Sequence, residues 1–531
     1  MSETLDVLER RWKGACKSIF GQEACGLIEC SKWLADFIEP ISQNKSSLSG
    51  KEVISAPTGY CKGAKWLSFD EVDFNKKFEP LNVNEIKDID SLVEGISERI
   101  YYSGNVVFGK SGYIEKSSNL NDSFYIYGVG RNGNSKYLAY CTIGRMNENC
   151  FGCNGIGEST YCIKCSRCFK NLRCFEAWMS QNSSDCYYSS GLESCSECLF
   201  SFNMQNKKRC IGNLELGLEK YKKIKGKLLA EMAQKLSKEK KLLSLTEIVK
   251  KSRLEKPETG THDSGRKEML DKSIIESSFL KTTSIVFGKP LDGGIDTYSK
   301  WLTRHTRPTV NCFSAASKKE LYRPSAVNYE RLPKDRLLSQ PEAYGLGRRE
   351  KLEENDINGL SLENAHEKIG NLAFFNIEWD EGKNRNNIEC VMVADATNGY
   401  RNSLMIHVKN SGYNFWPRDS DHIFGCDSPF SSQFSIKCHS CTNQIRSFEI
   451  DCCGYCSDSY FCHNCENMNN SMFCFNVKNR RNSIGNAELS PPDYQRVKKL
   501  LLGQMHDELS SKKDLKYDIY NVACLASAKR L

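Results

Sequence analysis

The sequence contains no long apolar segment and no recognisable leader. No stretch approaches the roughly 18 consecutive apolar residues that a membrane-spanning helix requires, and the first fourteen residues, MSETLDVLERRWKG, are charged and lack the apolar core of a signal peptide. We therefore expect a soluble, cytoplasmic protein with no membrane partner.

Catalytic signatures are absent as well. The chain has no GxxxxGK[ST], HExxH or GxSxG motif. The glycine-rich GVGRNGN at 128–134 is typical of a turn. Histidine is scarce, with 8 in 531 residues, and no cysteine, histidine and asparagine form a recognisable nucleophilic set. These absences favour a protein that is not an enzyme.

Cysteine, in contrast, is abundant, with 27 residues. Six of them follow one another at intervals of twelve: Cys150, Cys162, Cys174, Cys186, Cys198 and Cys210. Each precedes a large side chain, namely Phe151, Ile163, Phe175, Tyr187, Leu199 and Ile211. The frame recurs 273 residues later as Phe424, Ile436, Phe448, Tyr460, Met472 and Ile484. A fixed period of this length predicts stacked coils, and hence two β-solenoids. Before Ile423 the second copy indicates strands at looser spacing.

The duplication extends beyond the coils, because the segment 18–34 resembles 284–302, and both end in SKWL. We predict an α+β fold made by tandem duplication, a pseudo-dimer within one chain. Each half has a small helical front part, a β-solenoid with a period of twelve residues and a C-terminal capping helix. The predicted parts are a mixed helical part (1–104), the first solenoid (105–214), a capping helix (215–249), a linker (250–275), a second mixed part (276–385), the second solenoid (386–487), and a capping helix with a tail (488–531).

The second copy tests what the cysteine column is for. Where the first copy has cysteine, the second has Ser435, Ser447, Ser459, Ser471 and Ser483. Serine keeps the size of cysteine but does not ligate soft metals, so we interpret the column as a structural ladder and favour no cofactor. Strand alternation predicts that Phe151, Cys153 and Ile156 begin inward columns and that Cys150 faces outward.

A zinc or iron–sulfur site is the alternative interpretation. Paired CxxC motifs can supply four thiolates, and the second copy contains CHSC, DCCGYC and CHNC within 28 residues. The candidate ligands are Cys438, His439, Cys441, Cys453, Cys456, Cys462, His463 and Cys465.

Matched basic residues end both copies, in FNMQNKKRC and FNVKNRRNS. Basic side chains beside aromatic ones suit contacts with a phosphate backbone. The nucleic-acid-binding candidates are Lys207, Lys208, Arg209, Lys478, Arg480 and Arg481.

The segment RCFEAWMSQNSSDCYYSSGLESCSECLFSFNMQNKKRCIGN (173–213) resembles Cys-rich repeat proteins of unassigned function from archaeal and large-phage genomes. The resemblance implies a scaffold or assembly component and supplies no activity. We predict a non-enzymatic scaffold whose rigid, basic-edged solenoids present a surface to a large partner, RNA or a ribonucleoprotein. The alternatives are a structural component that self-assembles, such as a particle shell, and a metal protein.

Overall fold

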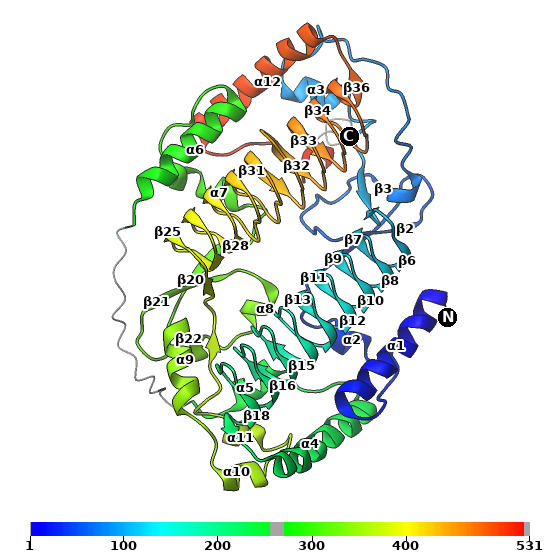
Figure 1. Cartoon of the computed structure of the whole chain (residues 1–531). Coiled ribbons are helices and arrows are strands. Elements are labelled where there is room, and N and C mark those ends of the chain that lie inside the picture. Colours follow the sequence, from blue (N-terminus) through cyan, green and yellow to red (C-terminus); the bar gives the residue numbers. More distant parts are fainter. Residues whose placement is uncertain (1, 255–256, 258–269, 525–531) are drawn as a thin grey trace.

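The computed structural model describes residues 2–254, 257 and 270–524, so most of the predicted linker at 250–275 lies outside the described residues. The fold mixes α-helices with parallel β-sheets, and the described strands form no closed barrel. Figure 1 shows two long stacks of short strands that diverge from one another, with helices along their outer sides. No described helix is long and apolar enough to cross a bilayer.

The first stack runs from Val107 to Glu215. Its strands are β5 (Val107–Phe108), β6 (Gly112–Glu115), β7 (Ser118–Asn121), β8 (Phe124–Tyr127), β9 (Gly130–Gly133), β10 (Lys136–Ala139), β11 (Thr142–Arg145), β12 (Glu148–Phe151), β13 (Asn154–Gly157), β14 (Thr160–Ile163), β15 (Leu172–Trp178), β16 (Ser184–Ser190), β17 (Ser196–Leu199), β18 (Lys208–Ile211) and β19 (Leu214–Glu215). One sheet of ten strands and one of five share these strands.

The second stack runs from Asp380 to Glu488. Its strands are β24 (Asp380–Glu381), β25 (Arg385–Ile388), β26 (Val391–Ala394), β27 (Thr397–Tyr400), β28 (Ser403–Ile406), β29 (Lys409–Gly412), β30 (Asp421–Phe424), β31 (Gln433–His439), β32 (Phe448–Asp451), β33 (Ser457–His463), β34 (Asn469–Met472), β35 (Arg481–Ile484) and β36 (Ala487–Glu488). Both stacks finish in a short antiparallel turn-back, β18 with β19 and β35 with β36.

The remaining elements surround the stacks. The helices are α1 (Glu3–Phe20), α2 (Ser31–Leu34), α3 (Ile89–Gly95), α4 (Leu218–Glu239), α5 (Leu245–Lys251), α6 (Lys272–Phe287), α7 (Ser299–Thr303), α8 (Val327–Glu330), α9 (Gln340–Arg349), α10 (Glu354–Asn358), α11 (Ala365–Lys368) and α12 (Pro491–Lys512), with 3-10 turns at Phe69–Glu71, Ile295–Tyr298 and Lys334–Arg336. The other strands are β1 (Ser42–Lys45), β2 (Glu52–Ser55), β3 (Trp66–Ser68), β4 (Tyr102–Gly104), β20 (Thr309–Phe313), β21 (Glu320–Pro324), β22 (Leu337–Leu338) and β23 (Phe375–Asn376).

Within both stacks, neighbouring parallel strands pair residues that are twelve apart. Cys162 lies opposite Cys174, and Cys186 opposite Cys198. In the second stack the same register already holds at Asn387 opposite Gly399. The looser spacing expected before Ile423 is therefore wrong: these early rungs lack the cysteines that mark the period but keep its hydrogen-bond register.

Each rung turns at every third residue. Asn149, Gly152, Gly155, Glu158 and Tyr161 all have φ between 51° and 71°, the left-handed region that disfavours L-residues with a side chain. Two extended residues followed by one left-handed residue bend the chain repeatedly, so twelve residues complete four short sides. Inward side chains then recur every third residue, whereas a flat strand would place them at every second.

This geometry corrects the predicted orientation of two columns. Cys150, Cys153 and Ile156 belong to one buried cluster inside the first stack, whereas Phe151 packs outside the coil, with its ring centroid 5.2 Å from that of Trp12 on α1. The expectation that Cys150 faces outward and Phe151 inward is thus wrong, because it assumed strand alternation. The inward placement of Cys153 and Ile156 is confirmed.

Small polar side chains inside the coil accept hydrogen bonds that the neighbouring backbone leaves open. Cys153 Sγ accepts from the amide of Cys165 at 3.4 Å, one rung further on. In another column, Ser159 Oγ accepts from the amide of Asn171, and Asn171 Oδ1 accepts from the amide of Ser183, both at 3.1 Å. Cysteine, serine and asparagine therefore do the same work, which is to satisfy a buried N–H group.

The hydrogen that each thiol or hydroxyl donates follows the same rule. Cys162 Sγ donates to the carbonyl of Thr160 at 3.7 Å, and its counterpart Ser435 Oγ donates to the carbonyl of Gln433 at 2.9 Å. This shared contact explains why the cysteine column of the first stack becomes a serine column in the second.

The aromatic columns outside the coils are covered by amphipathic helices. Helix α1 packs across β8, β10, β12, β14 and β15, and α6 across β27, β29, β30 and β31. Helices α4 and α12 continue these covers, burying Leu228 and Met232 in the first half and Leu501 and Met505 in the second. Consequently the larger hydrophobic cores lie between stack and helices, outside the narrow coils.

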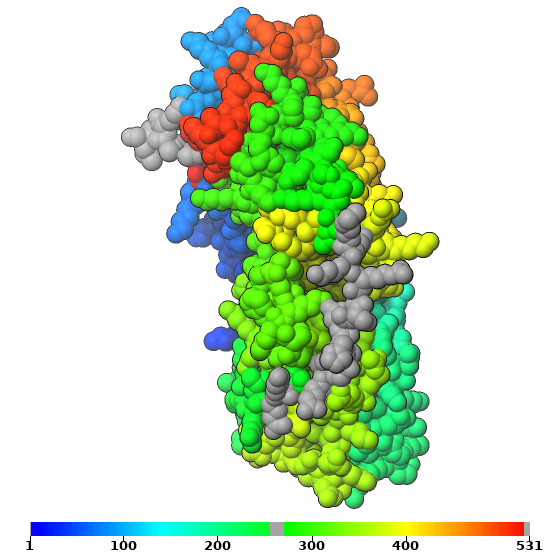
Figure 2. Space-filling model, turned by 90° about the vertical axis from the view of Figure 1, so that its left-hand side faces the viewer, coloured from blue at the N-terminus to red at the C-terminus, as the bar shows by residue number. Residues whose placement is uncertain are grey.

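The last rung of each stack is covered by the other half of the chain. Asn203 donates to the carbonyl of Phe374 at 2.9 Å, and Asn476 donates to the carbonyl of Tyr101 at 2.8 Å. Asn476 lies 273 residues after Asn203, and Tyr101 lies 273 residues before Phe374. Figure 1 shows α10 and α11 beside the β18 end and α3 beside the β34 end. In the space-filling view of Figure 2, the early residues in blue lie against the C-terminal helix in red and orange.

A buried lysine and glutamate recur at equivalent places in the two halves. Lys164 Nζ donates to the carbonyl of Trp33 at 2.6 Å, and Lys437 Nζ to that of Trp301 at 3.0 Å. Burial raises the pKa of Glu176, near Lys164, and of Glu449, near Lys437, to about 7 in both cases, although the lysines lower it.

Substituting Cys153 tests the hydrogen-bond ladder. Cys153→Ala removes the acceptor of the Cys165 amide, whereas Cys153→Ser keeps one, so we expect the alanine variant to lose about 1–3 kcal/mol more unfolding free energy than the serine variant. Urea unfolding followed by circular dichroism measures the difference. Equal losses in the two variants would show that only the volume of the thiol matters.

Cleaving the chain between the halves tests the mutual covering of stack ends. With a protease site inserted between residues 258 and 269, we expect both fragments to co-elute after cleavage, because each covers the other's final rung. A first-half fragment expressed alone should aggregate, because an uncovered rung exposes unpaired backbone groups. Separation of the cleaved fragments on size exclusion in native buffer would contradict this arrangement.

The buried glutamates predict a pH dependence of stability. Their pKa rises from 4.5 in an exposed side chain to about 7 in the folded state, so their contribution to stability is complete below about 4.5 and is lost as the pH rises to about 7. We expect Glu176→Gln with Glu449→Gln to remove this loss between pH 5 and 7.5, on the order of 2–3 kcal/mol for each glutamate. Thermal unfolding at several pH values measures the pH dependence of stability. Glu219→Gln, on the exposed face of α4, is the control. A double variant with the pH profile of the unmodified chain would contradict the prediction.

Candidate functional site: the cleft between the two stacks

The predicted basic residues lie at opposite ends of the molecule. Lys207 and Lys208 are beside β18, and Arg481 begins β35, so the two groups do not form one surface. Lys207 lies 3.7 Å from Glu215, and Lys208 lies 3.9 Å from Glu197. Arg209, in the first group, is half-buried. In the second group, Lys478 forms an ion pair with Glu466 at 2.7 Å, and Arg480 donates to the carbonyl of Lys76 at 3.1 Å. The backbone amide of Arg481 donates to Glu488 at 3.1 Å.

The predicted metal ligands separate into an inner and an outer set. The inner set consists of Cys438, Cys441, Cys453, Cys456, Cys462 and Cys465, which lie inside the second stack with their thiols bonded to backbone carbonyls. His439 and His463 are outside the coil, in register with Asp451 between them. The described residues contain no group of three or more His, Cys, Asp or Glu side chains arranged to hold a metal ion.

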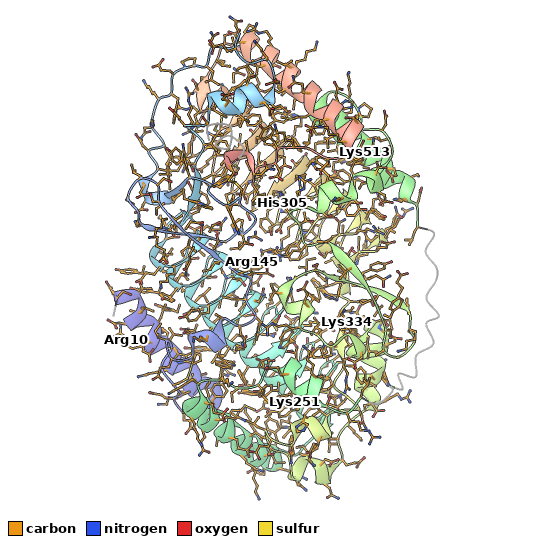
Figure 3. The ribbon with its side chains drawn as sticks, turned by 180° about the vertical axis from the view of Figure 1, so that it is seen from behind. Arg10, Arg145, Lys251, His305, Lys334 and Lys513 are labelled. Carbon is orange, nitrogen blue, oxygen red and sulfur yellow. A yellow bond between two sulfur atoms is a disulfide. The ribbon has the colours of Figure 1, made fainter. Side chains whose placement is uncertain are left out.

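The two histidines instead belong to a buried polar cluster. His463 Nδ1 lies 3.0 Å from Asp451 Oδ2, and its Nε2 accepts from the amide of Ser103 at 2.8 Å. The ring nitrogens of His439 make no hydrogen bond within the described residues, and burial lowers the pKa of this histidine well below the ordinary value. Its ring contacts those of His305 and Tyr520. Figure 3 places His305 toward the middle of the molecule. This cluster is buried, so it joins the halves but offers no open site.

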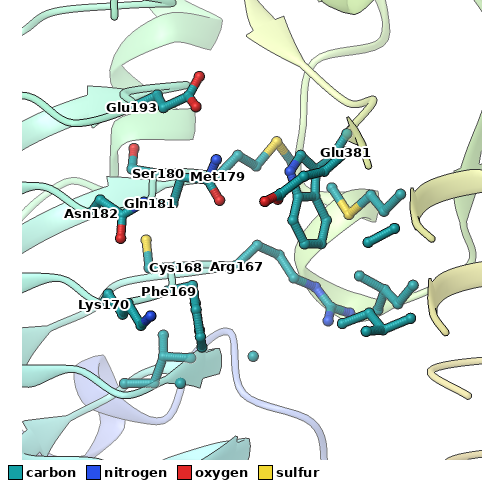
Figure 4. A pocket seen from close by; sticks show the side chains of 18 of the residues that line it. Arg167, Cys168, Phe169, Lys170, Met179, Ser180, Gln181, Asn182, Glu193 and Glu381 are labelled. Atoms are coloured by element: carbon teal, nitrogen blue, oxygen red, sulfur yellow. The ribbon is translucent and has the colours of Figure 1, made fainter. Parts of the chain in front are cut away.

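An open cleft of about 410 Å³ lies between the stacks. The first stack lines it with residues of 143–193 and the second with residues of 379–418, and Tyr344 of α9 adds to its wall. Figure 4 shows the two sets of strands facing one another, with Arg167 and Met179 reaching across the gap from the first stack. A cavity of this volume is within the range of about 300–1,000 Å³ that is usual for ligand sites.

Arg167 is the most unusual residue of the cleft. Its Nε and Nη2 atoms are buried and make no hydrogen bond within the part of the chain that the structure describes. The guanidinium lies 5.4 Å from the ring centroid of Tyr329 and 5.6 Å from that of Phe415, which stabilise a cation through their π-faces. Burial lowers the pKa of Arg167, so an anion brought to it would relieve an electrostatic cost.

A second arginine of the cleft lining, Arg418, comes from the other stack. Arg418 Nε is buried and has no hydrogen-bond partner among the described residues, and its guanidinium lies 5.4 Å from the ring of Trp416. Burial, with a smaller effect from Arg145, lowers the pKa of Arg418 to about 10. Arg145 and Lys170 share one carboxylate, Glu158, at 3.6 and 3.8 Å. Cations therefore outnumber their local partners at this end of the cleft.

Acidic side chains line the other end. Glu193 accepts hydrogen bonds from Gln205 at 2.7 Å and from Tyr344 at 3.2 Å. Glu378, whose pKa is raised by burial, accepts from the amide of Gln340. Figure 4 shows Glu193 and Lys170 at opposite ends. The cleft lining thus carries both signs of charge beside half-buried aromatic rings: the cations are Arg145, Arg167, Lys170 and Arg418, the carboxylates are Glu193, Glu378, Glu381 and Asp395, and the rings include Phe169, Trp379 and Trp416.

Sequence reasoning missed this site entirely. Arg167 occupies a turning position of its rung, with φ of 54°, and Arg418 lies between the turning residues Trp416 and Asp419; neither arginine belongs to a motif. The rings that contact Arg167, those of Tyr329 and Phe415, are more than 160 residues away in the sequence.

Comparison with protein-family models, with curated proteins and with solved structures finds no match to this chain. The resemblance of residues 173–213 to Cys-rich repeat proteins therefore stays a prediction, and the functional argument depends on the cleft.

Proposed function

We propose that the chain is a non-enzymatic binding scaffold, made of two β-solenoids that arose by tandem duplication, and that its cleft binds single-stranded RNA. The observation that carries the proposal is that two half-buried arginines of an open cleft, Arg167 and Arg418, lie beside aromatic rings and have buried side-chain nitrogens (Nε and Nη2 of Arg167, Nε of Arg418) without hydrogen-bond partners among the described residues.

Contacts repeated at a constant offset support the duplication. Phe202 donates its amide to Asn213, and Phe475 donates its amide to Asn486, with a shift of 273 in both residues. Gly152 and Gly425, also 273 apart, have φ of 67° and 66°. A β-carbon on Gly152 would lie 2.9 Å from the carbonyl oxygen of Leu34 in α2, and one on Gly425 would lie 2.8 Å from that of Leu302 in α7. Matched contacts of this kind are expected of two copies of one ancestral unit.

The framework supports a binding role because it fixes the cleft walls. Both walls are β-stacks whose rungs are bonded to one another, and each stack end is held by the other half. Side chains on such walls are preorganised, which reduces the entropy lost on binding. The described cleft residues form no nucleophile–base pair, and the buried His463–Asp451 pair lies outside the cleft lining.

Single-stranded RNA fits the lining better than the other partners considered. Proteins that bind single strands combine cations along the backbone with aromatic rings on which bases stack, and guanidiniums form paired hydrogen bonds with phosphate. The cleft supplies Arg145, Arg167, Lys170 and Arg418 beside Phe169, Trp379 and Trp416.

Binding of a labelled 20-nucleotide single-stranded RNA, measured by fluorescence anisotropy between 50 and 200 mM salt, tests the proposal. We expect Arg145→Ala, Lys170→Ala and Arg418→Ala together to weaken binding at least tenfold and to reduce the slope of log affinity against log salt by about 2, since each phosphate contact on a single strand contributes roughly 0.7.

The matched control removes four cations at the stack ends: Lys207→Ala, Lys208→Ala, Arg480→Ala and Arg481→Ala. We expect it to bind within about threefold of the unmodified chain. If this variant loses binding and the cleft variant does not, the terminal basic groups carry the function. If the unmodified chain binds no RNA, the proposal fails in favour of a protein partner.

A further inference from the structure

One disulfide joins segments that are far apart in the sequence and stays within reach of solvent. All 27 cysteines lie among the described residues, and only four of them form disulfides, Cys25 with Cys30 and Cys61 with Cys524. Cys25 and Cys30 are buried, whereas Cys61 and Cys524 are half-buried. We infer that the Cys61–Cys524 disulfide is a redox latch, which holds residues 514–524 against the buried polar cluster when oxidised and lets this segment open when reduced. The inference is independent of the proposed RNA binding.

The latched segment, residues 514–524, lies directly on the buried polar cluster. The amide of Ile519 donates to Glu449 Oε2 at 2.9 Å, and Asp518 Oδ2 lies 2.9 Å from His305 Nε2. These contacts come from residues only a few positions before Cys524. A bond that fixes Cys524 therefore also restrains the residues that close the cluster.

The loop that carries Cys61 is held to the same segment and to the same cluster. The amide of Cys61 donates to the carbonyl of Tyr520 at 3.0 Å. Tyr60, the preceding residue, donates its hydroxyl to Asp451, and its ring centroid lies 4.8 Å from that of Tyr520. The disulfide thus fastens two segments that both contact the cluster, so loss of the bond weakens the hold on each of them.

The first half covers its own buried glutamate without a disulfide. There the amide of Leu245, the first residue of α5, donates to Glu176 Oε2 at 3.0 Å, which matches the contact that Ile519 makes in the second half. Helix α5 stabilises its segment with a capping box and with internal hydrogen bonds. Residues 514–520, in contrast, form neither helix nor strand. A segment without regular structure opens locally at lower cost, so the covalent bond matters more at this end of the molecule.

Opening the latch requires a dithiol reductant. One thiolate of the reductant attacks a sulfur of the Cys61–Cys524 bond, which breaks that bond and leaves a mixed disulfide and one cysteine thiol. The second thiolate of the reductant then displaces the other cysteine, so two electrons and two protons pass to the chain and the reductant leaves as its own disulfide. A disulfide oxidant reverses the exchange. Attack requires access to the sulfur, which the half-buried pair offers and the buried pair does not.

Hydrogen–deuterium exchange followed by mass spectrometry tests the latch on the full chain. We expect dithiothreitol in native buffer to reduce Cys61–Cys524 but not Cys25–Cys30, as read by differential alkylation, and to speed exchange in residues 514–524 about tenfold or more. Exchange in α5 should stay within about twofold of its original rate, because no disulfide holds that segment.

Two double variants separate the latch from other effects of the reductant. Cys61→Ser with Cys524→Ser should exchange fast in residues 514–524 with or without dithiothreitol. The matched control, Cys25→Ser with Cys30→Ser, should keep the response to the reductant. Oxidised glutathione should restore slow exchange in the reduced, unmodified chain.

Three results would overturn the inference. The first is that Cys61 and Cys524 stay unlinked in oxidising buffer. The second is that their reduction leaves the exchange of residues 514–524 unchanged. The third is that reduction speeds exchange in α5 to the same extent, since the disulfide would then stabilise the whole fold and not one segment.

Discussion

The structure depends on how a very narrow coil satisfies its inward N–H groups. Because every third residue is left-handed, several inward amides have no backbone carbonyl as a hydrogen-bond acceptor. A small side chain one rung earlier accepts from them instead, as Cys153 does for the amide of Cys165 and Asn171 for that of Ser183. Larger apolar residues cannot replace these acceptors without leaving buried donors unpaired. Cysteine, serine and asparagine therefore share the coil interior with apolar residues such as Ile126, Leu138 and Ile156, and its composition follows from hydrogen bonding as well as from hydrophobicity.

This interior has consequences for the rest of the chain. Because it buries few large side chains, most apolar stabilisation must come from columns such as Phe151 and Phe424, which face outward and need a cover. Helices α1, α4, α6 and α12 provide it. The last rung of each stack also needs a cover. Each half of the chain covers the last rung of the other half's stack. The two halves therefore form a single framework, and the cleft lies between the two stacks.

The period of twelve was predictable because cysteine occupies one column in successive rungs, so spacing alone revealed it. The direction in which that column points was not predictable. Residues such as Tyr161 and Lys164 adopt a left-handed backbone conformation that their residue types do not indicate, so the alternation of an ordinary strand was assumed. The interchange of Cys162 with Ser435 fits a structural column, because both side chains donate to the backbone carbonyl two residues earlier. The cleft could not be predicted, since Arg167 acquires its meaning from Tyr329 and Phe415, which only the folded chain brings near.

An unpaired guanidinium in a buried setting is costly for stability, and the chain holds two of them in its cleft. Neighbouring rings reduce that cost for Arg167 and Arg418 but do not replace hydrogen bonds. A protein that needed these arginines only for packing would be better served by methionine, which fills the same space beside Met179 and Met392 without a charge. The donors of Arg167 and Arg418 that the described residues leave unused therefore support the proposed binding role of the cleft.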